Sequence, residues 1–138
     1  YRHLHPVTYE ELLNPQVPGL FRALKDRGLK IGIASSSYLG AVKEVVRLAR
    51  AEELVDFCIS GEQCRAHKPD PEIYLRAMEA LGLTAETALA VEDSPTGITA
   101  AKRAGIWVCA LKPRPELTLD QSAADAVLDR LDGVLEFL

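Results

Sequence analysis

The chain of 138 residues is long enough to form one domain with a hydrophobic core. Apolar residues make up 48% of it and charged residues 26%, a composition typical of soluble globular proteins rather than of disordered or membrane proteins. The net charge of -4 gives no general attraction for nucleic acid or anionic lipid, and no apolar run approaches the about 20 residues that span a bilayer. We therefore expect neither a nucleic-acid partner nor a membrane partner.

The first 28 residues predict two helices with a linker between them. A capping-box spacing predicts a short helix over residues 8–14. Two prolines and a glycine indicate a linker or hinge at residues 14–19. A second helix is predicted over residues 18–27, with Gly28 as its C-terminal stop.

Beyond Gly28, short apolar runs alternate with helical patterns, which is typical of an α/β fold with a parallel sheet. Asp70 is the predicted N-cap of one helix and Gly82 its stop. The aromatic residues Phe57 and Trp107 are expected in the core. The predicted elements, in chain order, are a strand at 29–34, a helix buried through Val42, Val45, Val46 and Ala49, a strand at 57–59, a helix at 71–81, a strand at 88–91, a helix at 96–104, strands at 106–111 and 126–128, and a terminal helix.

Three groups of polar side chains follow the predicted strands. A run of three serines, Ser35 to Ser37, lies between a strand and a helix, Lys68 lies in a proline-rich loop, and Glu92 and Asp93 end a strand. Open parallel sheets bind ligands outside the carboxyl ends of their strands. The spacing therefore predicts a ligand site built from these three groups.

Each group also has a simpler interpretation. Two adjacent carboxylates repel one another when they are desolvated, so Glu92 and Asp93 suit a hard cation such as magnesium, but one could cap a helix while the other is solvated. Lys68 could place a positive charge toward a phosphate or lie on the surface. The serines could cradle a phosphate with hydroxyl and N–H groups or cap the next helix.

The order of these groups along the chain resembles the haloacid dehalogenase superfamily. The resemblance runs from about Pro18 to near the C-terminus, and it is nearest to the branch that holds β-phosphoglucomutase and sugar-phosphate phosphatases. It rests on Val-Pro-Gly at 17–19 before a helix, Ile-Ala-Ser-Ser-Ser at 33–37, Lys-Pro-Asp-Pro at 68–71 and, most specifically, Glu-Asp-Ser-Pro-Thr-Gly-Ile-Thr-Ala-Ala at 92–101.

This resemblance implies a Rossmann-like α/β core with a parallel sheet and magnesium-dependent phosphoryl transfer. Ser35 would hydrogen-bond the phosphoryl group with Ser36 nearby, and Lys68 would neutralise charge on that group and on the attacking carboxylate. Asp93, with Glu92, would hold Mg²⁺. The implied partner is a small-molecule phosphate ester, expected to be a sugar phosphate.

The chain departs from the family at its first motif, the Asp-x-Asp segment whose first aspartate becomes phosphorylated. No such segment occurs here. The resemblance therefore assigns residues 1–16 to the end of a helical cap and its hinge, and residues 17–138 to the catalytic core without its first, central strand. We expect the nucleophilic aspartate to lie outside this chain, and these residues alone to form no stable, active domain.

Two other functions remain open from the sequence. A 2-haloacid dehalogenase shares the lysine-proline motif and needs no metal, although the acidic pair favours phosphate chemistry. A non-catalytic relative would keep the fold as a binding protein, although Ser35, Lys68 and Asp93 are all present. The three cysteines show neither a zinc spacing nor an even count for disulfides, so we expect buried thiols in a cytoplasmic protein. The sequence leaves the substrate and the oligomeric state open.

Overall fold

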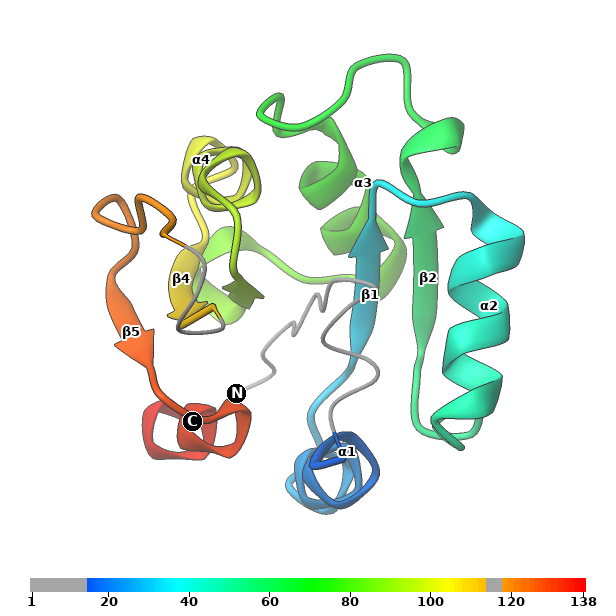
Figure 1. The fold of residues 1–138 in the computed structure, drawn as a ribbon. Coiled ribbons are helices and arrows are strands. Elements are labelled where there is room, and N and C mark those ends of the chain that lie inside the picture. The colour runs from blue at the N-terminus through cyan, green and yellow to red at the C-terminus, as the bar shows by residue number, and fades with distance from the viewer. Residues whose placement is uncertain (1–14, 114–117) are drawn as a thin grey trace.

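The computed structural model of the chain describes residues 15–113 and 118–138. Within these ranges, short parallel strands alternate with helices (Figure 1), which confirms the predicted α/β class. The elements are α1 (Val17–Asp26), β1 (Gly32–Ser35), α2 (Leu39–Leu48), β2 (Phe57–Ser60), the 3-10 turn η2 (Gly61–Gln63), α3 (Glu72–Leu81), η3 (Ala85–Thr87), β3 (Leu89–Glu92), α4 (Pro95–Arg103), β4 (Trp107–Leu111), β5 (Ala126–Leu128) and the 3-10 helix η4 (Leu131–Phe137).

The strands form two separate parallel sheets. One pairs β1 with β2, with Ser35 opposite Ser60 in register. The other has the order β3-β4-β5, with Glu92 opposite Ala110. Among the described residues β1 and β3 are not paired, so each presents an edge of backbone groups toward the other half. The break lies where the family resemblance predicts the missing central strand.

Alternate residues of the strands face two different cores. On one side, Ile33 of β1 and Val91 of β3 belong to a cluster that includes side chains of α1 and α2. On the other side, Ala34 and Ala90, their neighbours in sequence, belong to a cluster with α3 and α4. This period of two is expected of strands buried on both faces. The helices therefore cover the strands from two sides as a layered α/β/α arrangement.

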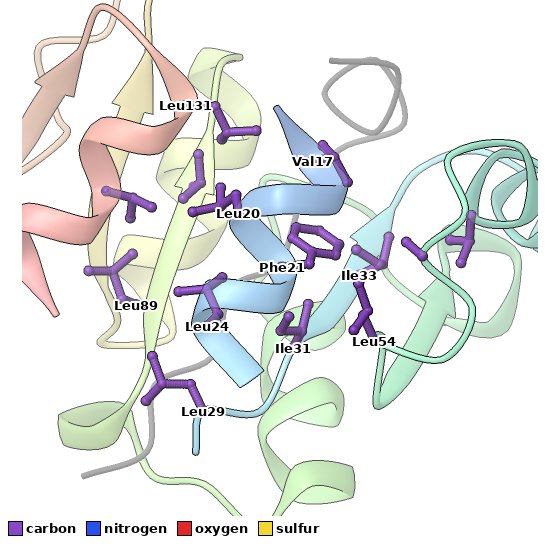
Figure 2. Close-up of a cluster of buried hydrophobic side chains, with 14 of the residues drawn as sticks. Val17, Leu20, Phe21, Leu24, Leu29, Ile31, Ile33, Leu54, Leu89 and Leu131 are labelled. Atoms are coloured by element: carbon purple, nitrogen blue, oxygen red, sulfur yellow. The ribbon is translucent and has the colours of Figure 1, made fainter. Parts of the chain in front are cut away.

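Helix α1 packs across the break between the two sheets. In Figure 2, Phe21 points toward Ile31 and Ile33 beside and within β1, while Leu24 points toward Leu89 of β3. Phe21 and Leu24 are both completely buried. Because each fully buried side chain of this size contributes about 1.5–3 kcal/mol, α1 supplies much of the cohesion that backbone pairing does not give here.

Most predicted helix boundaries agree with the structure, and those that differ do so at the ends of single helices. Gly28 and Gly82 take the left-handed conformation after α1 and α3, with φ of 77° and 68°, as their role as helix stops requires. The N-cap of α3 is Pro71 rather than Asp70, so that prediction was wrong by one residue. Asp70 still caps the helix, because its Oδ1 accepts the N–H of Glu72 at 2.9 Å.

Three further predictions concern the two ends of the chain. The linker at 14–19 was predicted three residues too long, because α1 begins at Val17 and accommodates Pro18 in its first turn. The predicted terminal helix is present, as the 3-10 helix η4. The helix predicted over 8–14 lies outside the described residues. Within those residues, no helix is both long and apolar enough to cross a bilayer.

Trp107 is not a core residue, contrary to the prediction. It is 38% exposed at the start of β4, and its ring centroid lies 5.1 Å from that of Phe137, which is 42% exposed. Together with Leu89 and Gly105, the two rings line a cavity of about 440 Å³. Leu89 and Trp107 begin their strands, so this cavity lies at the opposite end of the sheet from the polar strand ends. Phe57 is partly buried.

Candidate functional site

Lys68 connects the two sheets at the carboxyl ends of β1 and β3. Its Nζ donates to Oε2 of Glu92 at 2.6 Å and to the backbone oxygen of Ala34 at 3.3 Å. Ala34 immediately precedes Ser35, the last residue of β1, and Glu92 is the last residue of β3. The Lys68 side chain is only 7% exposed. The structure therefore brings three of the predicted site residues, Ser35, Lys68 and Glu92, to one edge of the fold.

Glu92 is buried, with 1% of its side chain exposed. Its Oε2 accepts hydrogen bonds from Lys68 Nζ and from the hydroxyl of Tyr74, while Oε1 has no hydrogen-bond partner among the described residues. Burial raises the pKa of Glu92, and the opposing effects of Lys68 and Tyr74 do not cancel it. The Lys68 ammonium also lies 5.3 Å from the centre of the Tyr74 ring, within the range of a cation–π contact.

The burial of Glu92 depends on the absence of a side chain at Gly97. A Cβ at this position would lie 2.1 Å from Oε1 of Glu92 and 2.4 Å from its Cδ, far inside van der Waals contact. Ser94 is the N-cap of α4, and its Oγ accepts the N–H of Gly97 at 3.1 Å. The turn after β3 therefore places the glycine backbone directly against the carboxylate.

Asp93 has different surroundings from its neighbour. It is half-buried, and its backbone oxygen accepts a hydrogen bond of 3.0 Å from Nε2 of Gln121, which also donates to the oxygen of Leu111 at 2.8 Å. Neither acidic residue is the N-cap of α4, since Ser94 has that position. The simpler interpretation of the pair, in which one carboxylate caps the helix, is therefore not what the structure has.

The donor set suits a magnesium ion only in part. Within residues 15–113 and 118–138, no three His, Cys, Asp or Glu side chains lie close enough together to hold a metal. Asp93 offers a partly accessible carboxylate, the oxygen ligand that magnesium prefers, and magnesium commonly keeps several waters and binds substrate phosphates. Glu92 already engages Lys68 and Tyr74 through Oε2. The chain thus fits as a contributor of one or two ligands.

The serine loop, residues 35–37 directly after the core of β1, is held by a hydrogen bond within it. Ser35 is 2% exposed, and its Oγ accepts the N–H of Ser37 at 3.1 Å. Ser36 is exposed. Tyr38 is the N-cap of α2 and makes no capping bond through its side chain. The serines therefore do not act as the N-cap of α2, which was their simpler interpretation.

Several side chains around this edge carried no functional signal in the sequence. Tyr74 lies on the apolar face of α3, where an aromatic residue is expected simply as core. Ser60 ends β2, Glu62 lies in the short turn η2, and Gln121 lies beyond β4. Each of them reaches a residue far away in the sequence, so only a tertiary structure could have identified its partner.

Comparisons with known proteins give a consistent result. Residues 2–105 match the family model of haloacid dehalogenase-like hydrolases. The chain is 37% identical over 101 residues to a phosphorylated carbohydrates phosphatase of Thermotoga maritima, covering 72% of this chain and 47% of that protein. It is 35% identical over 95 residues to haloacetate dehalogenase H-2 of Moraxella, covering 69% of this chain and 42% of that protein.

Solved structures resemble it as well. The chain superposes on a variant of CbbY from Rhodobacter sphaeroides, crystallised with xylulose-(1,5)bisphosphate, with a TM-score of 0.72 and 30% identity. The match covers 83% of this chain and 52% of CbbY. The chain thus spans about half the length of the curated relatives it matches.

Proposed function

The chain belongs to the haloacid dehalogenase-like hydrolase family, and on that premise we propose that the complete protein is a magnesium-dependent phosphatase or phosphomutase. The observation that carries the proposal is Lys68, which is held between the ends of β1 and β3 by Ala34 and Glu92. A buried, fixed cation beside a hydroxyl and a carboxylate is the arrangement that phosphoryl transfer requires, because positioning and charge neutralisation do most of the catalytic work.

Lys68 is proposed to neutralise the phosphoryl group and the attacking carboxylate. An ammonium has three N–H donors, and two of those of Lys68 go to Glu92 and Ala34. One donor remains for a phosphoryl oxygen among the contacts of the described residues. Holding the other two in place removes the cost of ordering a long flexible side chain when the substrate binds.

Ser35 and Ser36 are proposed to bind the phosphoryl oxygens, Ser35 through its hydroxyl and Ser36 through its exposed side chain and backbone. Asp93 is proposed as the principal magnesium ligand of this chain, with Glu92 beside it. When bound, magnesium would polarise the phosphoryl oxygens and neutralise their charge. Glu92, with Lys68 and Tyr74 on its Oε2, would mainly orient the lysine through the contacts described above.

The nucleophile is proposed to be an aspartate outside these residues. Two observations support this. The chain covers only about half of its relatives, and the parallel strands β1 and β3 have facing edges that are unpaired among the described residues. A further parallel strand between them would satisfy both edges and would end beside Lys68. Its terminal carboxylate would attack phosphorus and displace the sugar oxygen, which leaves as the protonated hydroxyl, to form an aspartyl phosphate. Water or a second hydroxyl would then take the phosphoryl group and free the aspartate.

The substrate is proposed to be a small phosphorylated sugar. This extends to the chain what the names of its relatives say, a phosphatase of phosphorylated carbohydrates and a protein crystallised with a pentulose bisphosphate. The similarity to a haloacetate dehalogenase of Moraxella supports the alternative function, a dehalogenase that needs no metal. Asp93 favours phosphate chemistry, because a second carboxylate next to Glu92 would hinder rather than help the binding of a negatively charged haloacid without a metal.

The test is hydrolysis by the complete protein of a panel of hexose and pentose phosphates, with Mg²⁺ or with EDTA, alongside chloroacetate. We expect either phosphate release, for a phosphatase, or isomerisation of the sugar phosphate, for a phosphomutase. This turnover should require Mg²⁺, be lost in Asp93→Asn and Lys68→Gln, and fall in Ser35→Ala. Chloride release from chloroacetate in EDTA would identify a dehalogenase instead. A folded complete protein that released neither ion and left every sugar phosphate unchanged, with no isomer formed, would support the non-catalytic alternative.

A further inference from the structure

The end of β2, the strand paired with β1, contacts the serine loop. Ser60, the last residue of β2, lies opposite Ser35 in the parallel register and is completely buried. Its Oγ donates to the backbone oxygen of Ser37 at 2.7 Å and accepts the N–H of Glu62 at 3.1 Å. The same hydroxyl therefore fixes the serine loop and the start of η2.

Glu62 makes a second connection between the same two segments. Its Oε1 accepts the N–H of Leu39, the first residue of α2, at 2.7 Å. The N-cap residue Tyr38 provides no side-chain acceptor for α2, so Glu62 caps this helix from a different loop. Gly61, between Ser60 and Glu62, lies close to the same loop, because a Cβ there would be in van der Waals contact with Cα of Ser36 at 3.4 Å.

We propose that Ser60 and Glu62 are positioning residues that hold the serine loop in the shape that receives a phosphoryl group, an inference that rests on the proposed function. Neither is a motif residue of the site, and neither needs to touch substrate. Ser60 binds the loop at Ser37, directly after Ser36, and Glu62 binds it at Leu39, two residues further on. A loop that is already held in its binding shape loses little conformational entropy when phosphate binds. We therefore expect the affinity for phosphate to depend on both contacts.

If Glu62 acts through its charge, its removal should raise the affinity for phosphate, and if it acts by positioning the loop, its removal should lower that affinity. A carboxylate near an anion site repels phosphate, so its removal alone would strengthen binding. The loss of the hydrogen bond to Leu39 would loosen the loop and weaken binding. Glu62→Gln removes the charge but keeps an oxygen acceptor, so it separates the two effects. Glu62 is exposed, so neither substitution threatens the fold.

The experiment measures the affinity of inorganic phosphate by calorimetry, in Mg²⁺, and amide hydrogen exchange at Leu39 by NMR, both on the complete protein. We expect phosphate to bind Glu62→Ala about fivefold more weakly than wild type, as the loss of one hydrogen bond implies. Exchange at Leu39 should be about tenfold faster. Glu62→Gln should behave as wild type, and so should Glu79→Ala, which removes the same charge from an exposed position on α3.

Two results would overturn the inference, and a third concerns the proposed function instead. Phosphate that bound Glu62→Ala as tightly as wild type, or more tightly, would show that Glu62 acts by charge or not at all. Unchanged exchange at Leu39 would show that Glu62 does not hold the loop, whatever the phosphate result. If wild type bound no phosphate, the proposed function would fall, and the exchange measurement alone would decide whether Glu62 holds the loop.

Discussion

The close contact between Gly97 and Glu92 makes Gly97→Ala the most informative single substitution for the architecture of the site. Gly97 is the third residue of α4, and alanine is favoured over glycine within a helix by up to about 1 kcal/mol. Here its Cβ would lie 2.1 Å from Oε1 of Glu92, so the carboxylate must leave its position against Lys68 and Tyr74. Breaking a buried ion pair costs about 3–5 kcal/mol. We therefore expect a net loss of about 2–4 kcal/mol in the free energy of unfolding, from these two terms.

Urea denaturation of the complete protein, followed by circular dichroism, measures this change. Gly40→Ala in α2 is the matched control, because nothing lies within 4 Å of a Cβ there, and it should stabilise the protein by about 0.5–1 kcal/mol. Combining Gly97→Ala with Glu92→Ala removes the clash, so in that background the alanine should no longer destabilise. If Gly97→Ala were as stable as Gly40→Ala, the packing of the carboxylate on the glycine would be refuted.

Three further predictions concern single side chains. Tyr74→Phe keeps the ring but removes the hydroxyl bond to the buried Glu92, so it should lower the free energy of unfolding by about 1–3 kcal/mol; no change in a urea titration would mean that this bond is not made. Asp125 is partly buried, but hydrogen bonds from Lys102 and a backbone N–H lower its pKa. The ionised carboxylate therefore stabilises the folded protein above the unfolded pKa of about 3.9, and this stabilisation is lost as the pH falls through the folded pKa. Wild type should therefore exceed Asp125→Asn in stability at pH 7, with the difference shrinking below about pH 4; a difference that grew in acid would contradict the sign. Burial raises the pKa of Cys109 to about 12, so this thiol should resist a disulfide reagent at pH 8 until the protein is unfolded.

The parts of the fold that depend on local chemistry could be predicted from the sequence. Gly28 and Gly82 could be identified as helix stops because many helices end in a left-handed residue, a conformation that glycine adopts without strain. The alternation of apolar strands with amphipathic helices gave the α/β class. The break between β1 and β3 followed from the family resemblance, since the absent first motif belongs to a central strand.

The parts that depend on long-range contacts could not be predicted. In the sequence Glu92 and Asp93 are equivalent neighbours, yet one is buried against Lys68 and the other is half-exposed, because successive residues at a strand end face different surroundings. Tyr74 looks like any aromatic core residue until its hydroxyl is seen on the Glu92 carboxylate. Trp107 was expected in the core as a large aromatic residue. It is instead 38% exposed, because it is the first residue of β4, at the end of the central strand of its sheet.

In the proposed reaction, a phosphoryl group passes through an aspartate outside this chain while Ser35, Lys68 and Asp93 hold it in place. The direct measurement is to mix the complete protein with ³²P-labelled sugar phosphate, quench with acid within a turnover, and map the labelled peptide. We expect a label that hydroxylamine removes, on an aspartate outside residues 1–138, and much less label in Lys68→Gln. A label on Ser35, or rapid turnover with no labelled protein, would contradict it.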